Sequence, residues 1–107
     1  MKLILAIIST DDAKACTLAL TKESFHVTRL ATTGGFLSSG NTTLMIGLED
    51  NQVDKAIELI GQESKRRKEA VPMTVSNDIT TSLSYPVEVE VGGATIFVLD
   101  VERFEKL

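Results

Sequence analysis

The sequence predicts an α+β domain with the element order β-α-β-β-α-β and an added hairpin strand before the last strand. The chain has 107 residues, of which 43% are hydrophobic and 24% are charged, a balance typical of one folded domain, here expected over residues 1–107. Short apolar runs rich in branched side chains alternate with stretches in which apolar residues recur at helical spacing. A pair of glycines near the end separates two strand-like runs, as in a tight hairpin.

The first strand and the first helix are expected in residues 3–23. Residues 3–8 are continuously apolar and mostly branched, which predicts a strand buried on both faces. Thr10 or Asp11 can cap a helix over about 12–23, because the side-chain oxygen of either residue can accept an N–H of the first turn. This helix would pack through one apolar stripe, formed by Ala13, Cys16 and Leu20.

Two strands and a second helix follow. Residues 25–33 are β-branched and aromatic and predict the second strand, residues 34–41 a short glycine-rich loop, and residues 42–48 the third strand. Asp50 is expected to cap a longer helix that ends near the basic run 65–68, where positive charge meets the negative end of the helix dipole. The residues at helical spacing are Val53, Ala56, Ile57, Ile60 and Ser64.

The remaining residues predict a long loop and a hairpin. Residues 69–86 are mostly polar with a proline towards each end, and a loop of this length in a compact domain is usually functional or mobile. Residues 87–91 alternate as a half-exposed strand, Gly92 and Gly93 form the turn, and residues 94–101 return as the last strand.

This order is that of a ferredoxin-like fold, an antiparallel sheet with both helices on one face. Such a sheet leaves its second face open. Yet residues 3–8, 44–46 and 96–99 are apolar at successive positions, which calls for burial on both faces. Another copy of the chain would cover the second face. We therefore expect a homo-oligomer with closed symmetry.

Composition argues against several classes of protein. The formal net charge of −4 disfavours general binding to nucleic acids, which rests on Lys and Arg contacts to phosphates. No apolar run approaches the ~20 residues of a membrane span. The apolar start of the chain lacks a cleavage site and is interpreted as a strand rather than a signal peptide. The single cysteine cannot form an internal disulfide, so we expect a cytoplasmic protein with no nucleic-acid or membrane partner.

The most informative feature is a stretch without carboxylates between Glu23 and Glu49, in a chain with 15 acidic residues. It is rich in glycine and hydroxyl side chains, and His26 and Arg29 are its basic residues. Backbone N–H groups at glycine turns can bind an anion. Phe36 lies in the middle of this polar loop, which suits a flat ring with phosphates attached. The alternative is a plain glycine-rich turn with Phe36 packed into the core or an interface.

No set of residues predicts catalysis. His26 has no neighbouring cysteine or acidic residue, whereas zinc needs three or four ligands. Cys16 is interpreted as a small core residue, and Glu88 and Glu90 as solvent-facing residues of one strand. The Walker A, GxSxG and HExxH motifs are absent from the sequence. Binding without a metal or a cofactor is therefore favoured over enzymatic activity.

Two blocks of sequence resemble the PII-like cyclic di-AMP receptor family (PstA or DarA type) of Gram-positive bacteria. Residues 28–43 read TRLATTGGFLSSGNTT, and residues 85–99 read YPVEVEVGGATIFVL. The resemblance covers nearly the whole chain in order and length. It implies a homotrimer of ferredoxin-like protomers that holds cyclic di-AMP in the cleft between neighbouring protomers.

The resemblance also implies a set of ligand-binding residues. On the second strand Thr28 would form a hydrogen bond with the ligand, and alternation along the strand puts His26 on the same face. The full set is His26, Thr28, Gly35, Phe36, Leu37, Asn41, Gly47 and Phe97. Gly35, Phe36 and Leu37 would surround one adenine, and Gly47 would leave room for the ligand. The family commonly has Asn, Arg and Gln where this chain has Ser24, His26 and Lys106.

The leading hypothesis is a non-enzymatic sensor that binds cyclic di-AMP and, through its loops, changes a surface offered to an unidentified downstream protein. A first alternative is a PII-like trimer that senses ATP, ADP or another cyclic dinucleotide. A second is a small phosphodiester-processing enzyme with its site between subunits. A third is a structural assembly module, in which the stretch without carboxylates would be accidental.

Overall fold

The computed structural model describes residues 1–30, 40–73 and 85–107, and it confirms the α+β class with two helices and an antiparallel sheet. No helix in these described parts is long and apolar enough to cross a membrane. The elements are β1 (Lys2–Ser9), α1 (Thr10–Lys22), β2 (Val27–Leu30), β3 (Asn41–Leu48), the 3-10 turn η1 (Asp50–Gln52), α2 (Val53–Glu63), β4 (Arg67–Met73), β5 (Tyr85–Val91) and β6 (Ala94–Asp100).

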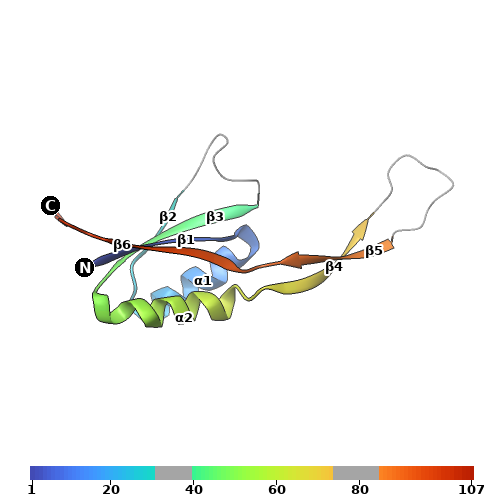
Figure 1. The fold of residues 1–107 in the computed structure, drawn as a ribbon, viewed down its shortest axis with the longest axis horizontal. Coiled ribbons are helices and arrows are strands. Elements are labelled where there is room, and N and C mark those ends of the chain that lie inside the picture. Colours follow the sequence, from blue (N-terminus) through green and yellow to red (C-terminus); the bar gives the residue numbers. More distant parts are fainter. Residues whose placement is uncertain (31–39, 74–84) are drawn as a thin grey trace.

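Four strands form one antiparallel sheet in the order β2-β3-β1-β6, and both helices cover the same face of it (Figure 1). In the register of this sheet, Leu5 of β1 lies opposite Met45 of β3 on one side and Phe97 of β6 on the other. Thr28 of β2 lies opposite Met45. Since directly opposed residues share a face, one row of side chains crosses all four strands from Thr28 to Phe97.

The hydrophobic core lies between the sheet and the helices. Alternate residues of β1 and β3 point into it, as the period of two in a strand requires. Its buried members include Ile4, Ala6, Ile8, Leu44, Ile46 and Leu48 from the strands and Ala13, Cys16, Leu20, Ala56 and Ile60 from the helices. The predicted role of Cys16 as a core residue is confirmed. Burial first, and then the charges of Asp12 and Glu63, raise the pKa of its thiol to about 11.

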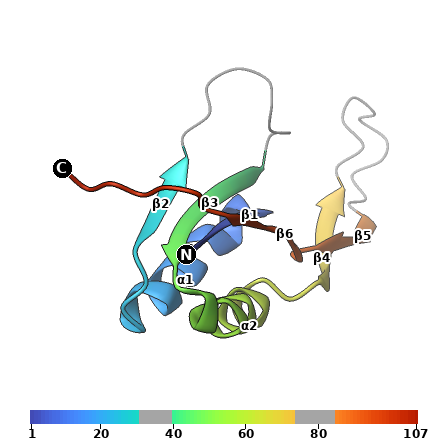
Figure 2. The same ribbon diagram turned by 60° about the vertical axis from the view of Figure 1, so that its left-hand side comes forward.

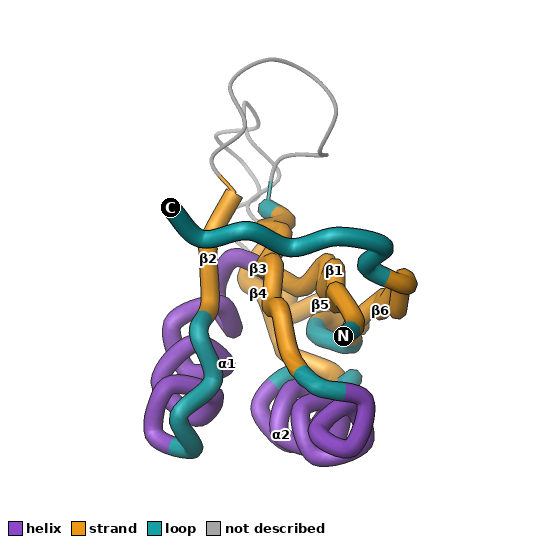
Figure 3. Tube along the Cα trace, turned by 90° about the vertical axis from the view of Figure 1, so that its left-hand side faces the viewer, coloured by secondary structure: helices purple, strands orange, loops and turns teal. Residues whose placement is uncertain are grey.

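The opposite face of the sheet is only partly covered. Leu3 and Leu5 are half-buried there, whereas Phe97 is 52% exposed and Leu99 is 43% exposed. Residues 101–107 leave β6 and run across this face towards β2 (Figures 2 and 3). Within one chain, the burial of both faces that the sequence predicts is therefore incomplete.

The start of α1 differs from the prediction. The helix begins at Thr10, and Ser9 precedes it in an extended conformation without a side-chain cap. Thr10 and Asp11 therefore lie in the first turn, and the prediction that either residue caps the helix is wrong. The Thr10 hydroxyl contacts β3 instead, with Thr10 Oγ1 2.9 Å from Thr42 Oγ1.

The start of α2 also differs. Glu49 and Gln52 form a reciprocal capping box around η1, in which the Glu49 N–H donates to Gln52 Oε1 at 3.0 Å. Glu49 therefore caps η1, and Gln52 precedes α2 without a side-chain cap bond to it. The predicted cap, Asp50, lies within η1, and its carboxylate lies 3.2 Å from the amino group of Met1. The helix ends at Glu63, next to the basic run 65–68, as predicted.

Beyond α2 the chain forms a ribbon of two antiparallel strands, β4 and β5, which projects from the main sheet (Figure 1). The loop predicted over residues 69–86 is therefore strand at both ends, and its residues 74–84 lie outside the described residues. The predicted hairpin between residues 87–91 and 94–101 is wrong, because β5 pairs with β4 and β6 pairs with β1. Alternation within residues 87–91 predicts a strand, but it does not identify the partner strand.

Gly92 and Gly93 join the ribbon to the main sheet. Both have a positive φ, 86° and 84°, which favours glycine at these positions. A Cβ on Gly92 would collide with the carbonyl oxygen of Lys65, and the Gly93 N–H donates to the carbonyl of Ser64. The two glycines thus let the chain pass closely over the end of α2.

Candidate functional site

A groove of about 740 Å³ lies on the partly covered face of the sheet, at the β2–β3 side. The floor of the groove comes from β1, β2 and β3. The segment 101–107, which crosses this face, forms a wall of the groove (Figure 3). The lining residues are Met1, Leu3, His26, Thr28, Met45, Gly47, Val101, Phe104, Glu105 and Lys106.

Three of the predicted ligand-binding residues lie together in this groove. His26 and Thr28 are exposed side chains two positions apart on the β2 segment, so they point to the same face. Val27 pairs with Ile46, and continuing this register by one residue puts His26 opposite Gly47. A Cβ on Gly47 would meet only the methyl end of Met1 at 3.5 Å, so the glycine leaves open space beside the two polar side chains.

Asn41 and Phe97 lie elsewhere in the single chain. Asn41 is at the opposite end of β3 from Gly47, a separation of roughly 20 Å at about 3.4 Å per residue. It lines a smaller pocket of about 160 Å³, together with Arg66 and Gly92. Phe97 is on β6, three strands away from Thr28 in the sheet order. The other three predicted residues, Gly35, Phe36 and Leu37, lie outside the described residues.

Several groove residues were not predicted as site residues. Leu3 and Met45 form the apolar floor, and the alternation of their strands, combined with the β1–β3 register, would have placed them on this face. Val101, Phe104 and Glu105 reach the groove because the chain after β6 crosses the sheet. The sequence of that segment has neither helical nor strand periodicity, so no signal indicated the crossing.

The segment that forms the outer wall is fixed to the sheet at its root. The Val101 N–H donates to the Met1 carbonyl at 3.2 Å, and Lys2 forms an ion pair with Asp100. This pairing lowers the pKa of Asp100 and raises the pKa of Lys2, in both cases chiefly through the hydrogen bond between them. The root of the wall is therefore held at the same end of the sheet as Gly47.

The groove combines an apolar floor with a polar rim. Leu3, Met45 and Phe104 supply flat apolar surface, while His26, Thr28 and Lys106 supply hydrogen-bond donors. Such a combination suits a planar heterocycle that carries anionic groups. The described parts of the chain contain no cluster of three or more His, Cys, Asp or Glu residues that could hold a metal ion.

Comparison with known proteins agrees with this chemistry. The model of the cyclic-di-AMP receptor family matches residues 1–107, the whole chain. A crystal structure from Pediococcus pentosaceus ATCC 25745, described as that of a functionally unknown protein, is 42% identical in sequence with a TM-score of 0.76. The match covers 99% of this chain and 96% of the Pediococcus chain. This chain therefore belongs to the cyclic-di-AMP receptor family.

Proposed function

We propose that this protein is a non-enzymatic signalling protein that binds cyclic di-AMP in the clefts between the subunits of a homotrimer. The observation that carries the proposal is the groove in which His26, Thr28 and Gly47 meet, because it is open and offers both apolar surface and donors. Each phosphodiester of the ligand carries one negative charge, which hydroxyl, imidazole and ammonium donors can bind.

The arrangement of the strands supports a site shared between subunits. β2 and β6 are the outer strands of the main sheet and run in opposite directions. The β6 edge of one subunit can therefore pair with the β2 edge of the next, and repeated head-to-tail pairing closes a ring. In such a ring Phe97 of one subunit borders the groove of its neighbour, which accounts for its distance from Thr28 within a single chain.

Relay to a downstream protein is the second part of the proposal. Two segments lie outside the described residues. Residues 31–39 come between β2 and β3, which border the groove, and residues 74–84 come between β4 and β5, which form the ribbon. Ligand contacts at the first segment would alter the surface that the protein presents. The family assignment supports cyclic di-AMP as the ligand. It does not identify the downstream protein.

The test is a calorimetric titration of the protein with cyclic di-AMP, ATP and ADP. We expect cyclic di-AMP to bind more tightly than either mononucleotide. Tighter binding of ATP or ADP would contradict the proposal and favour the alternative of a PII-like sensor for another nucleotide. Steady conversion of cyclic di-AMP to linear products during the titration would contradict the non-enzymatic part.

The Gly47→Val variant tests the groove as the ligand site. Valine suits a strand, and its branches would occupy space that the glycine leaves open, so we expect at least a tenfold loss of affinity, or about 1.4 kcal/mol. The thermal midpoint should stay close to that of the wild type, because position 47 is exposed.

Gly61→Ala is the matched control, since Gly61 lies in α2 with nothing within 4 Å of an added Cβ. It should leave the affinity unchanged. Full affinity in Gly47→Val would show that the ligand binds outside the groove.

A further inference from the structure

We propose that the first turn of α1 is a mechanical relay, in which the Asp12–Arg67 pair ties the position of the β4–β5 ribbon to the Gly40–Thr42 start of β3. This inference goes beyond the proposed function, because it concerns how two parts of the chain move together. It depends on that function only for the identity of the signal. Contacts leave this one helical turn in two directions, towards the ribbon and towards the sheet.

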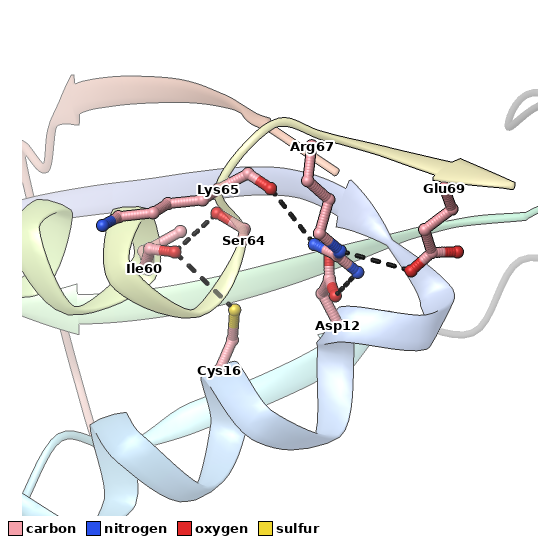
Figure 4. Close-up of polar contacts among 7 residues, drawn as sticks. All are labelled: Asp12, Cys16, Ile60, Ser64, Lys65, Arg67 and Glu69. Carbon is pink, nitrogen blue, oxygen red and sulfur yellow. Dashed lines mark hydrogen bonds and ion pairs between the residues drawn. The ribbon is translucent and has the colours of Figure 1, made fainter. Parts of the chain in front are cut away.

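On the ribbon side, Arg67 reaches from the start of β4 to α1. Its Nη2 lies 2.8 Å from Asp12 Oδ1, and its Nη1 lies 3.3 Å from Asp12 Oδ2, so the two planar groups pair through two bonds (Figure 4). The Asp12 side chain is 7% exposed. Its hydrogen bond to Arg67 is the main cause that raises the pKa of the guanidinium.

Arg67 is held in place by two further contacts. Its Nη1 donates to the Lys65 carbonyl at 3.1 Å, and its Nε donates to Glu69 Oε1 at 3.4 Å (Figure 4). The guanidinium therefore connects the strand β4, the link after α2 and the helix α1. A change in the angle of the ribbon must either carry Asp12 with it or break this ion pair, in which Asp12 is buried and Arg67 is 39% exposed. Breaking the pair would leave the Asp12 carboxylate buried without its partner, which is unfavourable.

On the sheet side, Thr10 joins the same turn to β3. The Thr10 N–H donates to the Gly40 carbonyl at 2.7 Å, and the hydroxyls of Thr10 and Thr42 lie 2.9 Å apart. Arg29 of β2 extends the chain of contacts, with Nη2 donating to Thr42 Oγ1 at 3.5 Å. The start of β3 and the adjoining part of β2 are thus attached to the helix two residues before Asp12.

The two attachments share a rigid body. Thr10 and Asp12 lie within one turn of α1, about 3 Å apart along the helix axis, so displacement of one moves the other. The network is contiguous through hydrogen-bonded groups and one helical turn, a kind of connection that can carry energetic coupling between sites. Movement of the Gly40–Thr42 start of β3 is therefore transmitted to the ribbon.

Amide hydrogen exchange of β4 and β5 tests the relay in a double-mutant cycle on the full chain. Thr42→Val removes the hydroxyl on the sheet side, and Arg67→Gln removes the guanidinium on the ribbon side. We expect Thr42→Val to speed ribbon exchange by about three- to tenfold in the wild-type background, and to have no further effect once Arg67 is replaced. Equal effects of Thr42→Val in both backgrounds, or no effect in either, would overturn the proposal.

Two matched controls separate the relay from general loosening. Arg66→Gln makes the same charge change at the neighbouring arginine, which is paired with Glu90 at 3.4 Å rather than with α1. Thr43→Val changes the adjacent buried threonine, which faces the other side of β3. Thr42→Val should still speed ribbon exchange in the Arg66→Gln background. Arg67→Gln should still change ribbon exchange in the Thr43→Val background. If Arg67→Gln does not fold, Arg67→Lys replaces it, because lysine keeps the charge but not the paired geometry.

A final arm adds cyclic di-AMP as the probe. We expect Arg67→Gln to bind it within about threefold of the wild-type affinity but to lose the ligand-dependent change in ribbon exchange. A change of undiminished size in Arg67→Gln would overturn the relay. Absence of cyclic di-AMP binding in the wild type contradicts the proposed function instead, and the mutant cycle then decides the relay without a ligand.

Discussion

Ser24 has a backbone φ of 69°, a conformation that residues with a side chain rarely adopt. It follows α1, where the Ser24 N–H donates to the Thr21 carbonyl and the Phe25 N–H donates to the Leu20 carbonyl, each at 3.0 Å. These two bonds define the Schellman motif, whose left-handed position usually holds glycine or sometimes asparagine. Since His26 comes two residues later, this turn also sets where β2 enters the groove.

Ser24→Gly should stabilise the protein. Glycine adopts the left-handed conformation without a steric cost, so we expect the free energy of unfolding in urea to rise by about 0.5–1 kcal/mol. Lys22→Gly is the control, because residue 22 is still helical and glycine there should lower the free energy of unfolding by a similar amount. Equal effects of the two substitutions would show that the turn carries no strain.

His26→Arg should strengthen the binding of cyclic di-AMP. Arginine supplies a permanent charge and a planar pair of donors at the rim of the groove, and we expect an affinity about three- to tenfold higher. Calorimetry at two salt concentrations checks this, because the gain should shrink at high salt. Thr28→Val, which removes a donor from the same strand, should weaken binding. Unchanged affinity in both variants would mean that β2 does not border the ligand.

Elements with strong local patterns were predictable, and elements that depend on a distant partner were not. β1 and β3 follow from apolar runs, and both helices follow from apolar stripes that pack into the core. β4 was missed because its sequence, RKEAVPM, is charged and contains a proline, and its strand conformation depends on pairing with β5. The helix starts differed because several neighbouring polar residues can cap, and local sequence does not select among them.

The candidate site shows the same division. Alternation along β2 predicted that His26 and Thr28 share a face, and the sheet register brings Gly47 beside them. Asn41 was expected to contact the same ligand as His26 and Thr28. In the single chain it lies at the other end of β3, away from this groove. Phe104 and Lys106 reach the groove through the path of residues 101–107, which only the tertiary structure reveals.

Two glycines in different elements should respond to alanine in opposite ways. Gly61 lies in α2 with free space around an added Cβ, so Gly61→Ala should raise the free energy of unfolding by about 0.5–1 kcal/mol. Gly92 has a positive φ and packs on the Lys65 carbonyl, so Gly92→Ala should lower it by about 2 kcal/mol or more. Urea unfolding measures both, and a stabilised Gly92→Ala would contradict the close approach at this link.

At the scale of the molecule, β6 carries a run of poorly covered apolar side chains. Phe97 and Leu99 are exposed on one face of the sheet, and Val98 is 44% exposed on the face that carries the helices. A contiguous exposed apolar strand at a sheet edge is typical of an interface. It is the feature of the single chain that most directly favours the proposed trimer.

Light scattering tests this prediction. We expect a mass three times the 11.6 kDa of the single chain, and we expect Val98→Lys to dissociate the assembly because it buries a charge in the interface. Leu18→Lys is the control, since Leu18 is 60% exposed on α1, and it should leave the mass unchanged. A wild-type mass of one chain at all concentrations would rule out both the trimer and the shared cleft.

The burial of Cys16 has a practical consequence. It is the single cysteine of the chain, its Sγ lies 3.9 Å from the Ile60 carbonyl oxygen inside the core, and the pKa of the thiol is raised to about 11. Since the thiolate is the reactive form, maleimide reagents at neutral pH should leave the native thiol intact. A cysteine introduced at exposed Glu90 of β5 would then be the one labelled position. Fluorescence or spin-label studies of the ribbon can thus start from the unaltered sequence.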